Sequence, residues 1–145
     1  MQWDTRAAET LAAHADLTLV ALPATLKAQI READLPRLRA SGPLGELLAK
    51  QSVAHGHTYK MGELGRTHSA LPDDLLNFQY DPVAAAVAVG WGRATIEERR
   101  IRTVVEGDIL RFVSDDQGRL IRVVTDVDGV TFGETWISAV EAAQR

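Results

Sequence analysis

The sequence predicts an α/β fold, and three observations support this. An alanine-rich helical pattern over residues 4–16 runs directly into a short apolar stretch over 17–22, which is typical of a buried strand. Three further strand patterns, separated by turn signals, follow one another between residues 101 and 125. An amphipathic helical pattern ends the chain. We therefore expect one domain over residues 1–145, with an initial helix–strand unit, a helical middle, a three-strand antiparallel patch and a terminal helix.

The first elements follow from capping and apolar spacing. Asp4 is the expected N-cap of the first helix, and the strand over 17–22 is expected to end at Pro23. A short helix is predicted over 31–40. A second, longer helix is predicted to begin at Pro43 and to end near Gly62 or Gly65. The residues expected on its inner face are Leu44, Leu47, Leu48 and Gln51.

The second half begins with a polar stretch over 66–79 that is expected to be a loop. Asp81 and Pro82 then predict a helix start, with Asp81 as N-cap, and the apolar run over 83–89 predicts a helix buried on all sides. Strands are predicted over 101–105, 109–113 and 120–125. Asp128 is the expected cap of the last helix, whose apolar stripe consists of Phe132, Trp136, Ile137 and Val140.

Composition excludes several classes of protein. The chain has 145 residues, 46% of them hydrophobic and 25% charged, so a globular domain is expected rather than a disordered one. A net charge of -4 argues against a general nucleic-acid binder. The absence of cysteine excludes a disulfide framework, a thiolate zinc site and a cysteine nucleophile. No targeting pattern or membrane-spanning run stands out, so a cytoplasmic protein without membrane partners is expected.

Several polar clusters favour a plain structural interpretation over a chemical one. His55 and His57, with His68, could suggest a metal site, but their spacing suits a strand while they stand in a predicted helix. The Asp126–Gly129 segment resembles part of a calcium loop without its further ligands, so helix capping by Asp128 is preferred. A basic cluster at 99–102 predicts an exposed, charged edge strand. The adjacent carboxylates at 73–74 are expected to point apart.

The segment from Asn77 to Pro82 carries more information. It places an amide, a phenol and a carboxylate at a loop-to-helix junction, where the helix N-terminus favours an ionised Asp81. Taken alone, Asp81 remains an N-cap more often than a metal ligand.

Tyr80-Asp81-Pro82-Val83-Ala84 resembles the His-Asp-Pro-Leu-Ala segment of the inosine–uridine-preferring nucleoside hydrolases. Other segments are similar in the same order. Gln2-Trp3-Asp4 resembles the helix start that follows the family's Glu-Phe-Asn motif, and Leu17–Leu22 resembles the strand before its Asp-Val-Thr segment. The 34–38 and 123–128 segments resemble a later short helix and the C-terminal strand. The resemblance implies the C-terminal portion of a Rossmann-like nucleoside hydrolase fold.

The resemblance also implies a chemistry, namely cleavage of the N-glycosidic bond between ribose and a purine or pyrimidine base. In the family a bound Ca²⁺ holds the ribose hydroxyls and the attacking water. Asp81 matches a calcium-ligating aspartate of the family, and Tyr80 stands where the family has a histidine acid. A phenol is a weaker acid than an imidazolium, so activation of the leaving base is in question. The family's N-terminal Asp-x-Asp-x-x-x-Asp-Asp signature has no match here.

Three hypotheses follow. In the first, the chain is the C-terminal half of a nucleoside hydrolase, inactive alone because one carboxylate cannot hold Ca²⁺, and able to act on a nucleoside only when the N-terminal half is supplied. In the second, it is a non-catalytic remnant that serves as a binding or assembly partner, with homo-oligomerisation as one form of this. In the third, it is an active enzyme that uses other residues.

Overall fold

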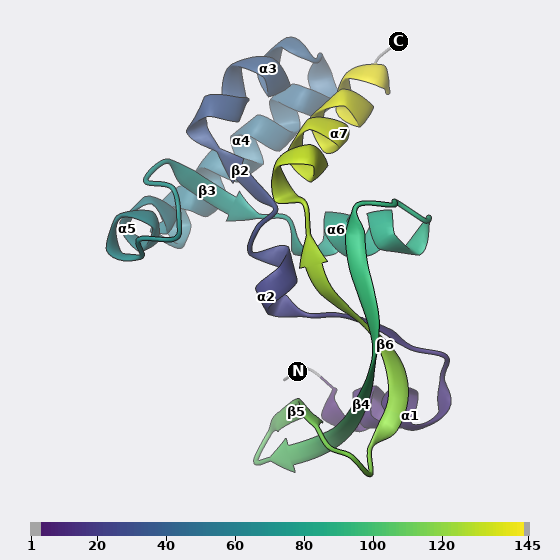
Figure 1. Ribbon diagram of the computed structural model, residues 1–145. Coiled ribbons are helices and arrows are strands. Elements are labelled where there is room, and N and C mark those ends of the chain that lie inside the picture. Colours follow the sequence, from purple (N-terminus) through teal and green to yellow (C-terminus); the bar gives the residue numbers. More distant parts are fainter. Residues whose placement is uncertain (1–3, 144–145) are drawn as a thin grey trace. The chain divides into compact units, whose positions relative to one another are not determined.

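The computed structural model describes residues 4–143 and has the α/β architecture that the sequence predicts (Figure 1). The single domain stays a prediction, and within it the chain divides into two compact units. The first unit takes in the chain up to Ala21 together with Thr95–Asp126, and the second takes in Leu22–Ala94 together with the chain from Val127 onward. Among the described residues, no helix is long and apolar enough to cross a membrane.

The first unit is a four-stranded mixed sheet with one helix. Helix α1 (Thr5–His14) is capped as predicted, because the Asp4 side chain accepts a hydrogen bond from the backbone N–H of Ala7 at 2.8 Å. The strands are β1 (Thr18–Val20), β4 (Ala94–Glu106), β5 (Ile109–Ser114) and β6 (Arg119–Val127), and they lie side by side in the order β1-β6-β4-β5. β1 pairs with β6 in parallel, and β4 pairs with β5 antiparallel. The three predicted strands of the C-terminal patch are thus confirmed.

Two expectations about this sheet are wrong. The strand predicted over 17–22 is only half-buried, because among the described strands β1 lies at the edge and has β6 as its one neighbour. The basic cluster does not lie on an edge strand, because β4 stands between β6 and β5. Its charges are exposed and paired as expected: Arg102 Nε lies 2.6 Å from Asp115 Oδ2, and Arg99 pairs with Glu97.

The second unit combines helices with a two-stranded sheet. Its helices are α2 (Leu22–Thr25), α3 (Leu35–Ala40), α4 (Pro43–Thr58), α5 (Met61–Thr67), α6 (Tyr80–Ala88) and α7 (Gly129–Ala142), with a 3₁₀ turn over Glu32–Asp34. Strands β2 (Gln29–Arg31) and β3 (Leu75–Phe78) pair antiparallel. Buried side chains from α3, α4, α7 and both strands form its main core: Ile30, Leu35, Leu38, Ala49, Leu76, Ile137 and Val140.

The short sheet corrects two predictions. β2 takes only the first residue of the helix predicted over 31–40, and the rest of that prediction is met by the 3₁₀ turn and α3. β3 lies within the loop predicted over 66–79. Pro23 does not follow a strand end directly but stands inside the short helix α2. The two strands have three and four residues, too few to show a period, and their pairing joins Gln29 to Phe78 across a long stretch of chain. Local pattern alone could not indicate this pairing.

Helix α4 begins at Pro43 as predicted, but small residues form most of its buried face. Of the predicted inner-face residues, Leu48 packs against the main core, whereas Leu44, Leu47 and Gln51 are exposed. The residues buried on α4 are Gly45, Ala49, Ser52 and Gly56. Small residues are required there because a Cβ on Gly45 would lie 2.0 Å from the carbonyl oxygen of Leu38. The helix ends at Thr58 rather than near Gly62 or Gly65, because Lys60 adopts a left-handed conformation with φ of 53° and α5 begins after it.

The helices that flank the predicted site behave differently from each other. α6 begins at Tyr80 with Gln79 as its N-cap, so Asp81 is the second helical residue and forms no cap hydrogen bond. The expectation of a helix buried on all sides is also wrong, because within α6 Val83 is buried while Ala85 and Ala88 are exposed. For α7 the prediction is confirmed: Asp128 Oδ1 accepts from the backbone N–H of Thr131 at 3.0 Å, and the apolar stripe of α7 faces inward.

Candidate functional site

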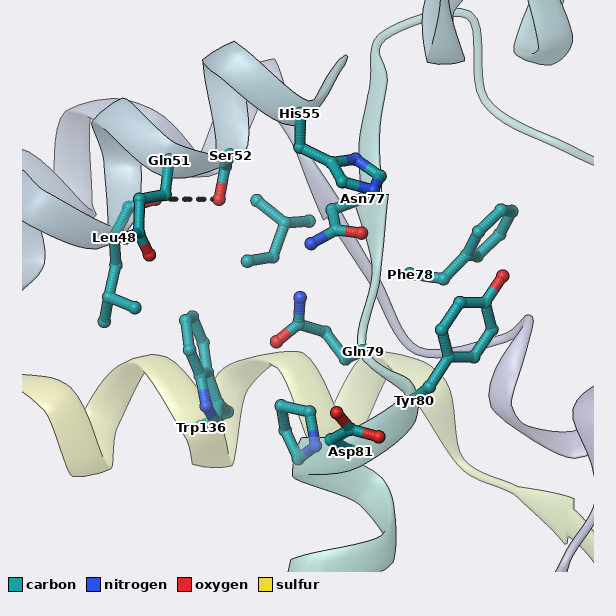
Figure 2. A pocket seen from close by; sticks show the side chains of 12 residues that line it. Leu48, Gln51, Ser52, His55, Asn77, Phe78, Gln79, Tyr80, Asp81 and Trp136 are labelled. Carbon is teal, nitrogen blue, oxygen red and sulfur yellow. Dashed lines mark hydrogen bonds between the residues drawn. The ribbon is translucent and has the colours of Figure 1, made fainter. Parts of the chain in front are cut away.

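A cavity of about 410 Å³ lies within the second unit, at the point where β3 passes into α6 (Figure 2). Helix α4 forms one wall and α7 contributes an aromatic ring, while the segment from Asn77 to Pro82 forms the opposite wall. The lining residues are Ile30, Leu48, Gln51, Ser52, His55, Asn77, Phe78, Gln79, Tyr80, Asp81, Pro82 and Trp136. The whole segment that the sequence singled out therefore lines one cavity.

The two predicted site residues, Tyr80 and Asp81, occupy the first turn of α6. The preceding residue is held firmly, because Gln79 is 5% exposed and its backbone N–H donates to the carbonyl oxygen of Ala28 at 2.8 Å. Asp81 is exposed at a helix N-terminus, where the backbone dipoles favour a negative charge. Its carboxylate is thus available to accept hydrogen bonds from a ligand in the cavity.

Tyr80 is a poor proton donor in this position. Its ring lies 5.6 Å from the ring of Phe78, centroid to centroid, and partial burial raises the pKa of its phenol above the ordinary value. A raised pKa means that the phenol remains protonated at neutral pH and releases its proton reluctantly. Tyr80 is therefore suited to donating a hydrogen bond rather than to transferring a proton.

His55 on α4 is a site residue that the sequence suggested only as a possible metal ligand. Its Nδ1 lies 3.0 Å from the carbonyl oxygen of Leu76, so Nδ1 carries the proton and donates, which leaves Nε2 as the second hydrogen-bonding atom. Its ring also packs against Tyr59 at 4.6 Å between centroids. The contact with β3 fixes the imidazole at the cavity wall.

Amides and an indole complete the lining. Figure 2 shows the carboxamides of Asn77 and Gln79 and the ring of Trp136 around the same space, with His55 on one side and Asp81 on another. Trp136 was expected only as part of the core stripe of α7. Its half-buried position adds an aromatic wall to groups that both donate and accept hydrogen bonds. Such a lining suits a planar, polar heterocycle.

Gln51 also lines the cavity, although the sequence predicted it on the inner, packed face of α4. A signal was present: Gln51 and His55 are four residues apart and so lie one turn apart on one face of a helix. The interpretation of α4 as packed through its leucines concealed this face.

The other polar clusters take structural roles. Asp128 caps α7, and its hydrogen bonds from the hydroxyl and the amide of Thr131 lower the pKa of its carboxyl. Asp74 accepts from Arg31 Nε at 2.7 Å, while Asp73 is exposed. His55 and His57 lie about 200° apart around α4, so they do not converge. His68 lies beyond α4, where its ring nitrogen contacts Thr67.

The cavity does not fit the calcium ion that the resemblance implies. Ca²⁺ takes six to eight oxygen ligands and prefers carboxylates, whereas Asp81 is the one carboxylate that lines this cavity. Over residues 4–143, no group of three or more histidine and acidic side chains could hold a metal ion. We therefore derive no step of a reaction through Ca²⁺ for these residues.

Comparison with known proteins adds no relationship: no family model and no curated protein matches the chain. The resemblance to nucleoside hydrolases thus rests on the residues quoted above. One part of it, Gln2-Trp3, lies outside the described residues.

Proposed function

We propose that this chain is the C-terminal portion of a nucleoside hydrolase and that its cavity receives the base and part of the ribose of a nucleoside. The observation that carries the proposal is the position of Tyr80-Asp81-Pro82, which turns from β3 into α6 at the wall of the cavity. The aromatic and amide groups opposite Asp81 have the chemistry that a nucleobase needs. The order of the family-like segments along the chain supports the same conclusion.

In this proposal each wall binds a different part of the nucleoside. Trp136 offers a face to the heterocycle, and Asn77, Gln79 and His55 offer donors and acceptors to its edge. The Asp81 carboxylate accepts hydrogen bonds from ribose hydroxyls. These groups bind and orient the nucleoside. Hydrolysis in the family also needs Ca²⁺, for which the cavity lacks oxygen ligands. The described residues are therefore expected to bind the nucleoside without hydrolysing it.

Calorimetric titration of the chain with inosine, uridine and the corresponding free bases tests the proposal. We expect the nucleosides to bind, and we expect Asp81→Asn to weaken nucleoside binding while leaving free-base binding unchanged, because only the nucleoside carries ribose hydroxyls. Trp136→Leu should weaken both. Asp73→Asn removes an exposed carboxylate outside the cavity and serves as the control.

Two further measurements bear on catalysis. Release of free base from inosine, followed by chromatography with and without added CaCl₂, is expected to stay at the uncatalysed rate for the chain alone. Addition of a polypeptide that carries the family's aspartate signature should produce base release that Asp81→Asn weakens, because Asp81 is proposed to bind the ribose hydroxyls. Failure of every nucleoside to bind, or binding that both Asp81→Asn and Trp136→Leu leave intact, would refute the proposal.

The second candidate function is a non-catalytic binding or assembly partner. One observation favours it: α4 exposes two large apolar side chains, with Leu47 51% exposed and Leu44 40% exposed. Surface leucines in this arrangement are typical of a helix that contacts another protein. In that case the nucleoside titrations give no heat, and the surface around Leu44 and Leu47 becomes the functional surface.

A further inference from the structure

A second hollow lies on the outer side of the α3–α4 pair, away from the nucleoside cavity. It has a volume of about 490 Å³ and is lined by Arg39 from α3 and by five residues of α4: Lys50, Val53, Ala54, His57 and Thr58. We call this hollow the outer groove. It shares no lining residue with the cavity that contains Asp81.

The outer groove combines an aliphatic floor with a cationic rim. Val53 is 39% exposed and Ala54 is exposed beside it, so apolar surface faces solvent. Arg39 and Lys50 are exposed as well, and the chain as a whole carries a net charge of -4, so these cations form a local exception. Within residues 4–143, no side-chain hydrogen bond or ion pair involves Arg39. Lys50 forms one exposed ion pair, with its Nζ 3.3 Å from Glu46 Oε1 one turn away.

The inner side of the same helix pair shows what such a surface binds. There α7 packs against α3 and α4 with Ile137 and Val140 in the shared core. Arg37 of α3 forms ion pairs with two glutamates of α7. Arg37 Nε lies 2.7 Å from Glu141 Oε1, and Arg37 Nη1 lies 2.6 Å from Glu134 Oε2. One helix with two apolar residues between two glutamates thus fills the inner side.

The outer side repeats the elements of that contact. Arg39 follows Arg37 by two residues, which places it about 200° around α3 and therefore on the opposite face. It stands next to the aliphatic floor of the groove, as Arg37 stands next to the core on the inner side, and Lys50 adds a second positive charge. The outer groove therefore has the chemistry that accepts a helix of the same type as α7.

We propose that the outer groove binds an acidic amphipathic helix of a partner protein. The apolar residues of that helix, three residues apart, cover Val53 and Ala54, and its flanking glutamates pair with Arg39 and Lys50. A second copy of this chain is a poorer occupant, because a two-fold dimer through the groove would place the same cations opposite one another. The inference is independent of nucleoside binding, since it uses none of the cavity residues.

The test uses the full chain and a designed peptide. The probe is a capped helical peptide with the spacing Glu-x-x-Ile-x-x-Val-Glu, as at positions 134–141, with alanine and glutamine elsewhere and a fluorescent label for anisotropy. We expect saturable binding, weakened about tenfold by the double variant Arg39→Glu, Lys50→Glu and about threefold by Lys50→Gln alone. A rise in NaCl concentration should weaken it further because the charges are exposed.

Matched controls separate charge from fold. The variant Arg6→Glu, Lys60→Glu changes the net charge equally at exposed sites outside the groove and should bind the probe as wild type does. Circular dichroism shows whether each variant is folded. If the double variant is unfolded, Lys50→Gln still tests the proposal, because the Lys50 side chain is 70% exposed and its replacement leaves the packing unchanged. Amide shifts in nuclear magnetic resonance should fall on Lys50, Val53 and His57.

Four results of the binding measurements would overturn the proposal. The first is no binding of the acidic probe. The second is equal binding by wild type and the groove variants. The third is equal binding of a probe with glutamine in place of glutamate, which would leave only apolar contact. The fourth is displacement of the probe by inorganic phosphate alone at low millimolar concentration, which would indicate a small-anion site. Sedimentation that shows a dimer lost in the double variant would instead assign the groove to a second copy.

Discussion

Substitution of Gly45 by alanine is expected to destabilise the second unit, although alanine is the better helix former. In α4 the change gains about 1 kcal/mol of helix propensity. The added Cβ, however, would lie 2.0 Å from the Leu38 carbonyl oxygen and 2.8 Å from the Ser41 Cβ. Real Cβ contacts are not shorter than 3.0 Å, so α4 has to move about 1 Å away from α3.

The size of the effect follows from these opposing contributions. Overpacking costs about 3 kcal/mol at the upper end of its usual range, which is appropriate because the obstacle is backbone and cannot rotate away. After subtraction of the propensity gain, the expected net loss is about 2 kcal/mol. Gly133 in α7 is the matched control: no described atom beyond its own helix backbone and chain neighbours lies within 4 Å of its Cβ position, so Gly133→Ala is expected to stabilise by about 1 kcal/mol.

Urea unfolding followed by tryptophan fluorescence measures both variants, because Trp91 and Trp136 belong to the unit under test. Relative to wild type, the free energy of unfolding should fall by about 2 kcal/mol in Gly45→Ala and rise by about 1 kcal/mol in Gly133→Ala. The dependence of that free energy on urea concentration should be unchanged. If Gly45→Ala stabilised the protein as much as Gly133→Ala, the close contact between α3 and α4 would not exist. The packing argument for the inner face of α4 would then be refuted.

Three further predictions concern charged and titrating groups. Asp128→Ala should lower the urea midpoint at pH 7, because the cap lowers the folded-state pKa of Asp128. The difference from wild type should shrink once the pH falls below the ordinary value of 3.8 and vanish below the lower folded-state pKa. Arg37→Gln should also lower the midpoint, by less at high salt, because the contacts of Arg37 with Glu134 and Glu141 are partly exposed; a salt-independent loss would contradict this. In an alkaline titration followed by phenolate absorbance, Tyr80→Phe should remove a tyrosine that ionises above the ordinary range, and loss of an ordinary tyrosine instead would show that burial does not raise its pKa.

The site was predictable where local chemistry is dense. The segment from Asn77 to Pro82 was singled out because it combines polar groups with a proline at a helix start, and all six of its residues line the cavity. The opposite wall was not predictable. His55, Gln51 and Trp136 come from helices whose approach to β3 depends on long-range packing, and each had a plain local interpretation.

α4 shows why apolar residues alone mislead. Its leucines suggested a buried face, yet its glycines and small residues make the close contact with α3 and with Leu76. A helix that packs at short distance against backbone needs the absence of side-chain volume, and a pattern of hydrophobicity does not report that absence. The same error concealed both the cavity that Asp81 lines and the outer groove, to each of which α4 contributes side chains.

By itself the sequence determined the α/β class, the two aspartate caps, the C-terminal strands and the segment that carries Tyr80 and Asp81. These features depend on neighbouring residues, because caps, turns and alternating strands act within a few positions of the chain. Only the tertiary structure decided the pairing of β2 with β3, the edge position of β1 and the division into two units. It also decided which face of α4 is buried. Each of these depends on which distant segments meet, and local pattern does not encode that.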